Sequence, residues 1–247
     1  PAWAGGNIYD RLYNTVVTGC NLETASYCRV WLDRIEVAPM ALSEIVSEVC
    51  TDVGLTTGEV SVAGLTDLVH GYLLFTRMRA RDALQPLLEA YFFDCVESDG
   101  VLKFPKRGTA SVVTIDEGDL AAHVSGSERP QEMTTTRQQE IELPKVVEVS
   151  YVDYRTQYDT GLQRHSRQVT DSEELLAINV PIAMNEDDAM QIAVKRLAYA
   201  WEQRTKHKVS IPRSYAWLDP ADVVTITKGS ATHVVRIESM ANRGGVL

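Results

Sequence analysis

The sequence predicts an α+β fold whose C-terminal half is rich in strands and carries one long helix. Three observations support this prediction. Apolar residues recur at helical spacing near 41–53, 79–91 and 185–205. The second of these segments runs directly into a pattern typical of a β-hairpin. From Ile141 onward, short runs of β-branched residues are separated by turn-forming residues, which is typical of strands.

The first 38 residues have a mixed pattern. The stretches Arg11–Thr18 (RLYNTVVT) and Arg29–Val37 (RVWLDRIEV) are strand-like, and the second partly alternates between apolar and polar residues. Pro39 then interrupts the pattern. We therefore expect short strands before Pro39.

A first helix is expected at 41–53, because one face of this segment is apolar and the other acidic. The apolar face carries Ile45, Val46, Val49, Cys50 and Val53. Gly54 follows where a C-terminal cap belongs.

A second helix is expected at about 79–91, with Leu84, Leu87, Leu88 and Tyr91 on its apolar face. Pro86 lacks a backbone N–H, so we expect this helix to bend there or to start late.

A hairpin follows the second helix. Phe92–Val96 and Val101–Phe104 have strand composition, and Ser98-Asp99-Gly100 supplies the turn. Ser111–Ile115 is a further expected strand. Residues 116–139 are polar, which favours a domain crossing or an exposed loop.

In the C-terminal half, Val146–Val152 is an expected strand, and 154–170 an expected hairpin around Asp159-Thr160-Gly161. Asn185 is a good N-cap for the last helix, and three acidic residues fill the first turn, where the helix dipole favours negative charge. We expect Lys206-His207-Lys208 at or beyond the basic C-terminal end of that helix. The expected buried stripe of the helix is Met190, Ala193, Val194, Leu197, Ala198 and Trp201.

Two final strands are expected at Val223–Thr227 and Thr232–Glu238, joined by a turn at Lys228-Gly229-Ser230. A turn through Leu218–Asp222 precedes them.

The 247 residues suffice for one large or two ordinary domains, and an apolar content of 45% is typical of a globular protein. No run approaches the roughly 18 apolar residues that cross a bilayer, so we expect no membrane insertion by this segment. The chain starts at Pro1 without an initiator Met, a basic region or a hydrophobic leader. We expect it to be an internal piece of a longer protein, or one whose ends were processed.

The formal net charge is −10, which argues against a dedicated DNA-binding surface, since such a surface needs clustered Lys and Arg. One small basic run contains Arg77, Arg79 and Arg81, and the far side of the hairpin carries Lys103, Lys106 and Arg107. These cations could meet as one positive patch. We favour a solubilising surface or contacts with acidic neighbours.

The four cysteines, at 20, 28, 50 and 95, show no spacing typical of a zinc site. We interpret Cys50 and Cys95 as buried thiols on a helix and a strand. A Cys20–Cys28 disulfide or an iron–sulfur ligand stays open, but the spacing argues for neither.

Catalytic motifs are absent from the sequence, and we expect no catalytic, cofactor-binding or metal-binding residues. Asp94, Glu97 and Asp99 lie close together in sequence, but strand alternation separates the first two, and turn chemistry explains the third. The histidines lie on unrelated segments, at 70, 123, 165, 207 and 233. No nucleophile elbow, phosphate-binding loop or paired-histidine metal motif occurs.

Three stretches resemble the tail-tip hub proteins of siphophages and gene transfer agents, the group that contains the putative phage tail protein region. The first, Leu42–Gly108, includes SEIVSEVCTDVGL, VHGY and ARDALQPLLEAYFFDCVESDGVLKFPKRG. The second is Leu143–Arg167, LPKVVEVSYVDYRTQYDTGLQRHSR. The third, Ile182–Thr227, contains DDAMQIAVKRLAYAWEQR and VSIPRSYAWLDPADVVTI. They occur in the order that the family has.

The resemblance implies a homotrimer at the tail tip of a virion, whose β-barrel hub domains form a pseudo-sixfold ring that continues the tail tube. The implied organisation is strands of a first hub barrel at 1–38, an inserted α+β domain at 39–115, a crossing or loop at 116–140, and a second hub β-barrel domain at 141–247. The helix at 185–205 would pack on the outside of that barrel.

The partners that the resemblance implies are the distal tail protein, the tape measure protein and other tail-tip proteins. DNA would pass through the lumen without specific binding, and an acidic lumen would suit the negative net charge. Larger relatives carry a glycosidase-like domain and some tail-tip proteins an iron–sulfur cluster. Neither the domain nor a matching cysteine motif is present in this sequence.

Two other functions stay open. A module that binds a host receptor or glycan would expose aromatic side chains, with Trp3, Trp31, Trp201 and Trp217 as candidates, although Trp201 lies on an expected core stripe. A cell-wall hydrolase would need two carboxylates that share a cleft at roughly 5–10 Å.

Overall fold

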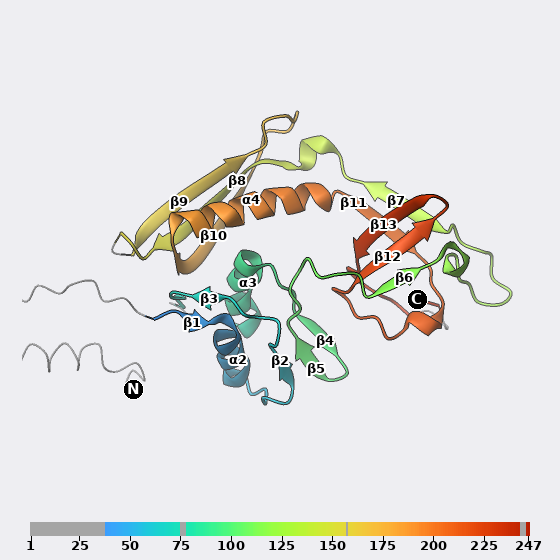
Figure 1. The fold of residues 1–247 in the computed structure, drawn as a ribbon, viewed down its shortest axis with the longest axis horizontal. Coiled ribbons are helices and arrows are strands. Elements are labelled where there is room, and N and C mark those ends of the chain that lie inside the picture. The colour runs from blue at the N-terminus through green and yellow to red at the C-terminus, as the bar shows by residue number, and fades with distance from the viewer. Residues whose placement is uncertain (1–37, 75–77, 157, 243–245) are drawn as a thin grey trace, which may run out of the picture. The chain divides into compact units, whose positions relative to one another are not determined.

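The computed structural model describes residues 38–74, 78–156, 158–242 and 246–247 (Figure 1). The chain divides into two compact units, Pro1–Ala38 and Pro39–Leu247, and every element named below belongs to the second. The expectations that fall outside the described residues are the strands before Pro39 and the residues Trp3, Cys20, Cys28, Trp31 and Arg77.

The predicted α+β class is confirmed. The described residues contain three α-helices, α2 (Leu42–Asp52), α3 (Ala80–Tyr91) and α4 (Glu186–Glu202). Their strands form five separate sheets of two or three strands each, and none of these sheets closes into a barrel within the described residues.

Helices α2 and α3 pack together through apolar faces that match the sequence pattern. Leu42, Val46 and Leu87 have no exposed surface, and Cys50 is only 2% exposed. Gly54 has a positive φ of 95°, as a residue just past a helix C-terminus requires. Helix α3 starts at Ala80 and contains Pro86, so the helix does not start late. Pro86 has no N–H to donate to the carbonyl of Asp82, four residues earlier.

Short strands surround these two helices. They are β1 (Met40–Ala41), β2 (Val60–Ser61), β3 (Leu68–Val69), β4 (Val96–Ser98) and β5 (Val101–Lys103).

The hairpin β4–β5 follows α3 as expected, but it is shorter than predicted. Phe92 adopts a left-handed conformation and ends the helix instead of opening the strand. Asp99 and Gly100 both have positive φ, at 53° and 74°, as a type I′ turn requires. Cys95 precedes β4 and is exposed, so its predicted burial was wrong. The strand is irregular before Val96, which removes the alternation on which that prediction relied.

The longest sheet has the order β10–β8–β9, and α4 packs on one of its faces (Figure 1). Its strands are β8 (Pro144–Asp153), β9 (Asp159–Ser166) and β10 (Glu174–Met184). β8 pairs parallel with β10 and antiparallel with β9. The predicted N-cap is confirmed, since the side-chain oxygen of Asn185 accepts a hydrogen bond from the backbone N–H of Asp188 at 2.8 Å.

The buried stripe of α4 is rotated from the predicted one. Ala193, Leu197 and Trp201 are buried as expected, whereas Val194 and Ala198 are exposed. Ala189 and Ile192 are buried instead. Val194 is apolar, but it does not lie on the face that meets the sheet. That face is formed by residues spaced three or four apart, beginning at Ala189.

The predicted turn at Asp159-Thr160-Gly161 was wrong, because these residues belong to β9 and the chain reverses before them. Gly161 lies opposite Tyr151 in the ladder. A β-carbon at Gly161 would lie within 2.8 Å of the Tyr151 hydroxyl oxygen. The glycine therefore makes room for a buried cross-strand tyrosine rather than forming a turn.

The remaining strands form two further sheets, β13–β12–β6 and β11–β7. Their bounds are β6 (Val113–Ile115), β7 (Met133–Arg137), β11 (Thr205–Val209), β12 (Val223–Lys228) and β13 (Ala231–Arg236).

Two features of this region differ from a simple helix end and loop. Lys206-His207-Lys208 lies beyond the end of α4, as expected, but in the strand β11. The polar segment 116–139, expected as a loop, contains β7, which pairs with β11. Its consecutive threonines are mostly exposed on both faces, so the segment lacks the apolar alternation by which half-buried strands are recognised.

The buried residues form two hydrophobic cores. The larger core joins α2 and α3 to α4 and its sheet. The second core is built mainly by β6, β12 and the loops beside them, with Ile115, Leu120, Ile211, Leu218, Val224 and Ile226. The fold thus consists of two separately packed bodies within one compact unit.

Replacing Gly161 by Ala should destabilise the protein by about 1–3 kcal/mol, because the new methyl group overlaps the buried Tyr151 ring. Urea denaturation would measure the change. Gly118→Ala is a matched control, since no atom lies within 4 Å of the corresponding β-carbon position. Equal stability of the two variants would contradict this account of Gly161.

Candidate functional site

The three neighbouring carboxylates have different surroundings. Asp94 forms ion pairs with Arg107 and Arg236. Glu97 is exposed on β4, and Asp99 forms the hairpin turn. Within the described residues, no three His, Cys, Asp or Glu side chains gather closely enough to hold a metal ion.

The structure brings two of the scattered histidines together. The rings of His207 and His233 lie 5.1 Å apart between centroids, and Nδ1 of His207 lies 3.0 Å from the Thr135 hydroxyl. Burial, and then the neighbouring His233, lower the pKa of His207. No sequence pattern indicates this pair, because the two histidines lie in different sheets.

Each of the three cations beyond the hairpin has an acidic partner. Lys103 pairs with Asp219 at 3.0 Å, and Lys106 with Asp67 at 2.6 Å. Arg107 pairs with Asp94 at 2.7 Å. This agrees with the favoured interpretation that the cations contact acidic neighbours.

Asp94 is the centre of a polar cluster between the two cores. One of its carboxylate oxygens accepts from Arg107 at 2.7 Å, and the other accepts from Arg236 of β13 at 2.8 Å. Both guanidinium groups also lie over the ring of Tyr199 in α4, at 4.9 and 5.9 Å from its centroid. Burial lowers the pKa of Arg107, but the hydrogen bonds and charge of Asp94 outweigh this effect and leave it raised.

The face of the long sheet that points away from α4 is largely exposed. We call it the open face, and define it by the residues in register on the three strands: Val146, Glu148, Ser150, Val152, Thr160, Leu162, Arg164, Ser166, Leu175, Ala177 and Asn179. Its only two charged side chains, Glu148 and Arg164, pair with each other at 3.7 Å. The open face is therefore a neutral surface of hydroxyl, amide and aliphatic groups.

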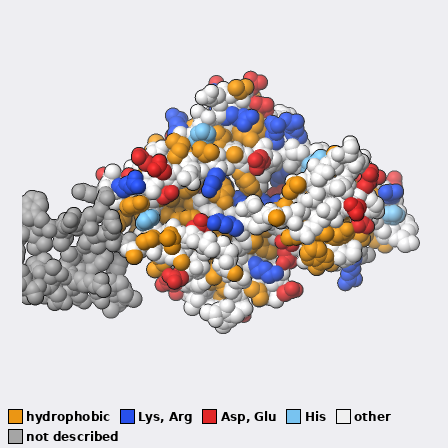
Figure 2. Space-filling model, in the orientation of Figure 1, with side chains coloured by type: hydrophobic (Ala, Val, Ile, Leu, Met, Phe, Trp, Pro, Cys, Tyr) orange, Lys and Arg blue, Asp and Glu red, His pale blue; other side chains and the backbone are white. Residues whose placement is uncertain are grey.

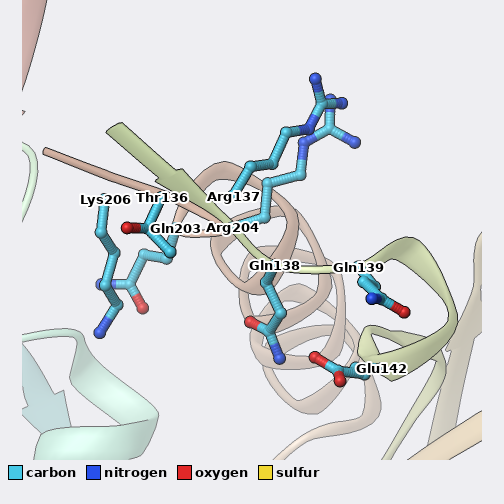
Figure 3. Close-up of a pocket in the computed structure, with 8 residues that line it drawn as sticks. All are labelled: Thr136, Arg137, Gln138, Gln139, Glu142, Gln203, Arg204 and Lys206. Carbon is cyan, nitrogen blue, oxygen red and sulfur yellow. The ribbon is translucent and has the colours of Figure 1, made fainter. Parts of the chain in front are cut away.

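A hollow of about 330 Å³ lies where β7 and β11 meet the end of α4 (Figure 3). Arg137 and Arg204 line it and point in the same direction, while Gln138, Gln139 and Glu142 lie on its other side. An adjoining hollow of about 470 Å³ shares Arg204 and adds Arg167 and Trp201. We call the two together the arginine hollow.

Elsewhere on the visible face, acidic and basic side chains are interspersed, without a continuous basic field (Figure 2). Trp217 is 58% exposed, whereas Trp201 is 7% exposed and donates its indole N–H to the carbonyl of Pro144. No helix in the described part of the chain has the length and apolarity that a membrane crossing needs.

The family described as "Putative phage tail protein" matches residues 79–240, well over half of the chain. The chain belongs to this family. The expected resemblance to phage tail proteins is thereby confirmed, and the region matched contains α3, the hairpin, the open face and the arginine hollow. No match is found among curated proteins.

Solved structures show the same fold for this phage tail protein. A chain in the virion of a native gene transfer agent particle matches 94% of it with a TM-score of 0.77 and 23% identity. A tail protein from Neisseria meningitidis MC58 matches 82% of it with a TM-score of 0.53 and 12% identity. The 43 kDa tail protein of prophage MuSo2 from Shewanella oneidensis matches 81% with a TM-score of 0.52 and 10% identity.

The phage tail protein chain covers only part of those relatives. It spans 53% of the gene transfer agent chain, 62% of the Neisseria protein and 60% of the Shewanella protein. At these identities the likeness shows the fold alone.

Replacing Asp94 by Asn should destabilise the phage tail protein by about 2–3 kcal/mol, because two partly buried arginines lose a charged acceptor. Chemical denaturation would measure the loss. Glu97→Gln, on the same hairpin but exposed, should change stability by less than about 0.5 kcal/mol. Similar losses in the two variants would contradict a special role for Asp94.

Acidification should weaken the fold through His207. Its pKa is lower in the folded state than the ordinary value near 6.5, so its contribution is complete above that value. The contribution is lost as the pH falls through 6.5 and the lower folded pKa. The urea midpoint of the wild type should therefore fall more between pH 7.5 and pH 5 than that of His207→Gln. An equal fall in both would refute this, and His165→Gln serves as the control.

Proposed function

We propose that this phage tail protein is a structural, non-enzymatic hub subunit at the tail tip, and that three copies form a ring which continues the tail tube. The observation that carries the proposal is the fold match over 94% of the chain to a chain of a gene transfer agent virion. The family resemblance supports the same role. Its partners in this proposal are the distal tail protein, the tape measure protein and other tail-tip proteins.

The long sheet has the form that a ring-forming element needs. One face is covered by α4, while the open face carries no helix or strand among the described residues. The outer edge of β9 is unpaired within the same residues, and so is that of β13. Free strand edges readily pair with other strands. In the proposed ring, pairing with neighbouring copies or domains would complete the barrels that the separate sheets leave open.

The open face then lines the channel, and α4 lies outside it. This face is neutral, so the expected acidic lumen is replaced in our proposal by one of hydroxyl, amide and aliphatic groups. Such a surface offers few cations to DNA phosphates, and nonspecific DNA binding depends on those cations. DNA would therefore pass without adsorbing.

Added positive charge on the open face should impede DNA delivery. Leu162→Lys places a cation on the open face, and Val194→Lys places the same cation on the outer side of α4. Both side chains are exposed, at 56% and 39%, so neither change should unfold the protein. We expect particles with Leu162→Lys to deliver DNA less efficiently than particles with Val194→Lys. Equal efficiency would refute the assignment of the open face to the channel.

Electron cryomicroscopy of purified particles would test the hub itself. The expected result is three copies around the axis at the tail tip, with the open face inward. A different copy number, or a position away from the tip, would overturn the proposal.

A further inference from the structure

The arginine hollow collects positive charge in a chain whose net charge is −10. Arg137 and Arg204 line one part of it, and Arg204 and Arg167 line the other. β7 and β11 bring the first two together, because Arg137 pairs with Thr205 and the N–H of Gln138 donates to the carbonyl of Arg204. The hollow is thus built by the pair β7–β11, which the sequence pattern did not predict.

None of these three arginines forms an ion pair with a carboxylate in the part of the chain that the structure describes. By contrast, Lys206 at the same hollow pairs with Glu238 at 2.9 Å. Like charges held close together disfavour the fold unless an anion lies between them. The fold therefore holds arginines together without supplying the negative charge that would compensate them.

Trp201 holds two of the arginines in place. The guanidinium of Arg167 lies 4.0 Å from the centroid of its indole ring, and that of Arg204 lies 5.7 Å from it. The indole itself is fixed by its hydrogen bond to Pro144 at 2.9 Å and by burial. Cation–π contacts restrict the arginine side chains before a ligand arrives, which lowers the entropy lost on binding.

The other lining residues indicate which anion fits. Glu142 and Glu202 also line the hollow and repel any anion, so negative charge can bind only next to the arginines. Separate carboxylates on a peptide can be placed there, whereas the continuous row of phosphates of a nucleic acid would also meet the two glutamates. Gln138, Gln139 and Gln203 supply amide donors and acceptors suited to a peptide backbone. Arginine forks bind carboxylates with two parallel hydrogen bonds. The mixture suits an acidic peptide with exposed amides better than a polyphosphate.

We propose that the arginine hollow is a docking site for a carboxylate-rich segment of a neighbouring tail protein, whose acidic side chains bind Arg137 and Arg204. This deepens the proposed function and rests on it, since it names the surface by which the subunit contacts a neighbour in the tail. The partner is defined by charge complementarity with the three arginines.

Titration of the full-length protein with a hexaglutamate peptide tests the docking site. The matched pair is Arg137→Gln/Arg204→Gln and Arg79→Gln/Arg81→Gln, which remove the same charge from the hollow and from the start of α3. We expect the first variant to weaken peptide binding at least tenfold and the second to leave it unchanged. Thermal denaturation of both would confirm that they fold.

Three outcomes would overturn the docking site: no peptide binding by the wild type, equal weakening in both variants, or tighter binding of duplex DNA than of the peptide. None of these outcomes depends on where the protein sits in the virion, which the microscopy above determines. Failure of the docking site and failure of the hub proposal can therefore be told apart.

Discussion

The Asp94 carboxylate accepts hydrogen bonds from two arginines that belong to different parts of the fold. Arg107 follows the hairpin beside the larger core, and Arg236 ends the strand β13 beside the second core. Both arginines also lie over the ring of Tyr199, so one carboxylate and one aromatic ring connect the hairpin, α4 and the C-terminal sheet. The two hydrophobic cores are separate, so this polar contact joins parts of the chain that share no common core.

The geometry of the contacts of Asp94 with Arg107 and Arg236 matters for their strength. Partly buried ion pairs are directional, and they lose strength steeply when geometry changes. Lys103 and Asp219 form a second ionic link between the hairpin and the loop before β12. Both links join the part of the chain around the larger core to the part around the second core.

The proposed roles use opposite sides of the same module. The sheet β10–β8–β9 needs α4 to cover Val147, Val149 and Tyr151, and this leaves the other face free. The C-terminal end of the same helix carries Trp201, which orders the arginines of the docking site. A single helix therefore supports both the proposed channel wall and the proposed contact with a neighbour.

The amino-acid sequence alone determined those features of the fold that depend on neighbouring residues. The N-cap at Asn185, the Asp99-Gly100 turn, the apolar faces of α2 and α3, and the last two strands follow from residue type and spacing, which act within a few residues. The family, too, was recognisable from its motifs. Tertiary structure decided the rest. β7 is a strand because β11 pairs with it, and Gly161 lies in a strand because β9 pairs with β8, where its missing side chain leaves room for Tyr151. The Asp94 and arginine clusters join residues far apart in the chain. Each depends on a partner that only folding brings near, and neither composition nor periodicity records such partners.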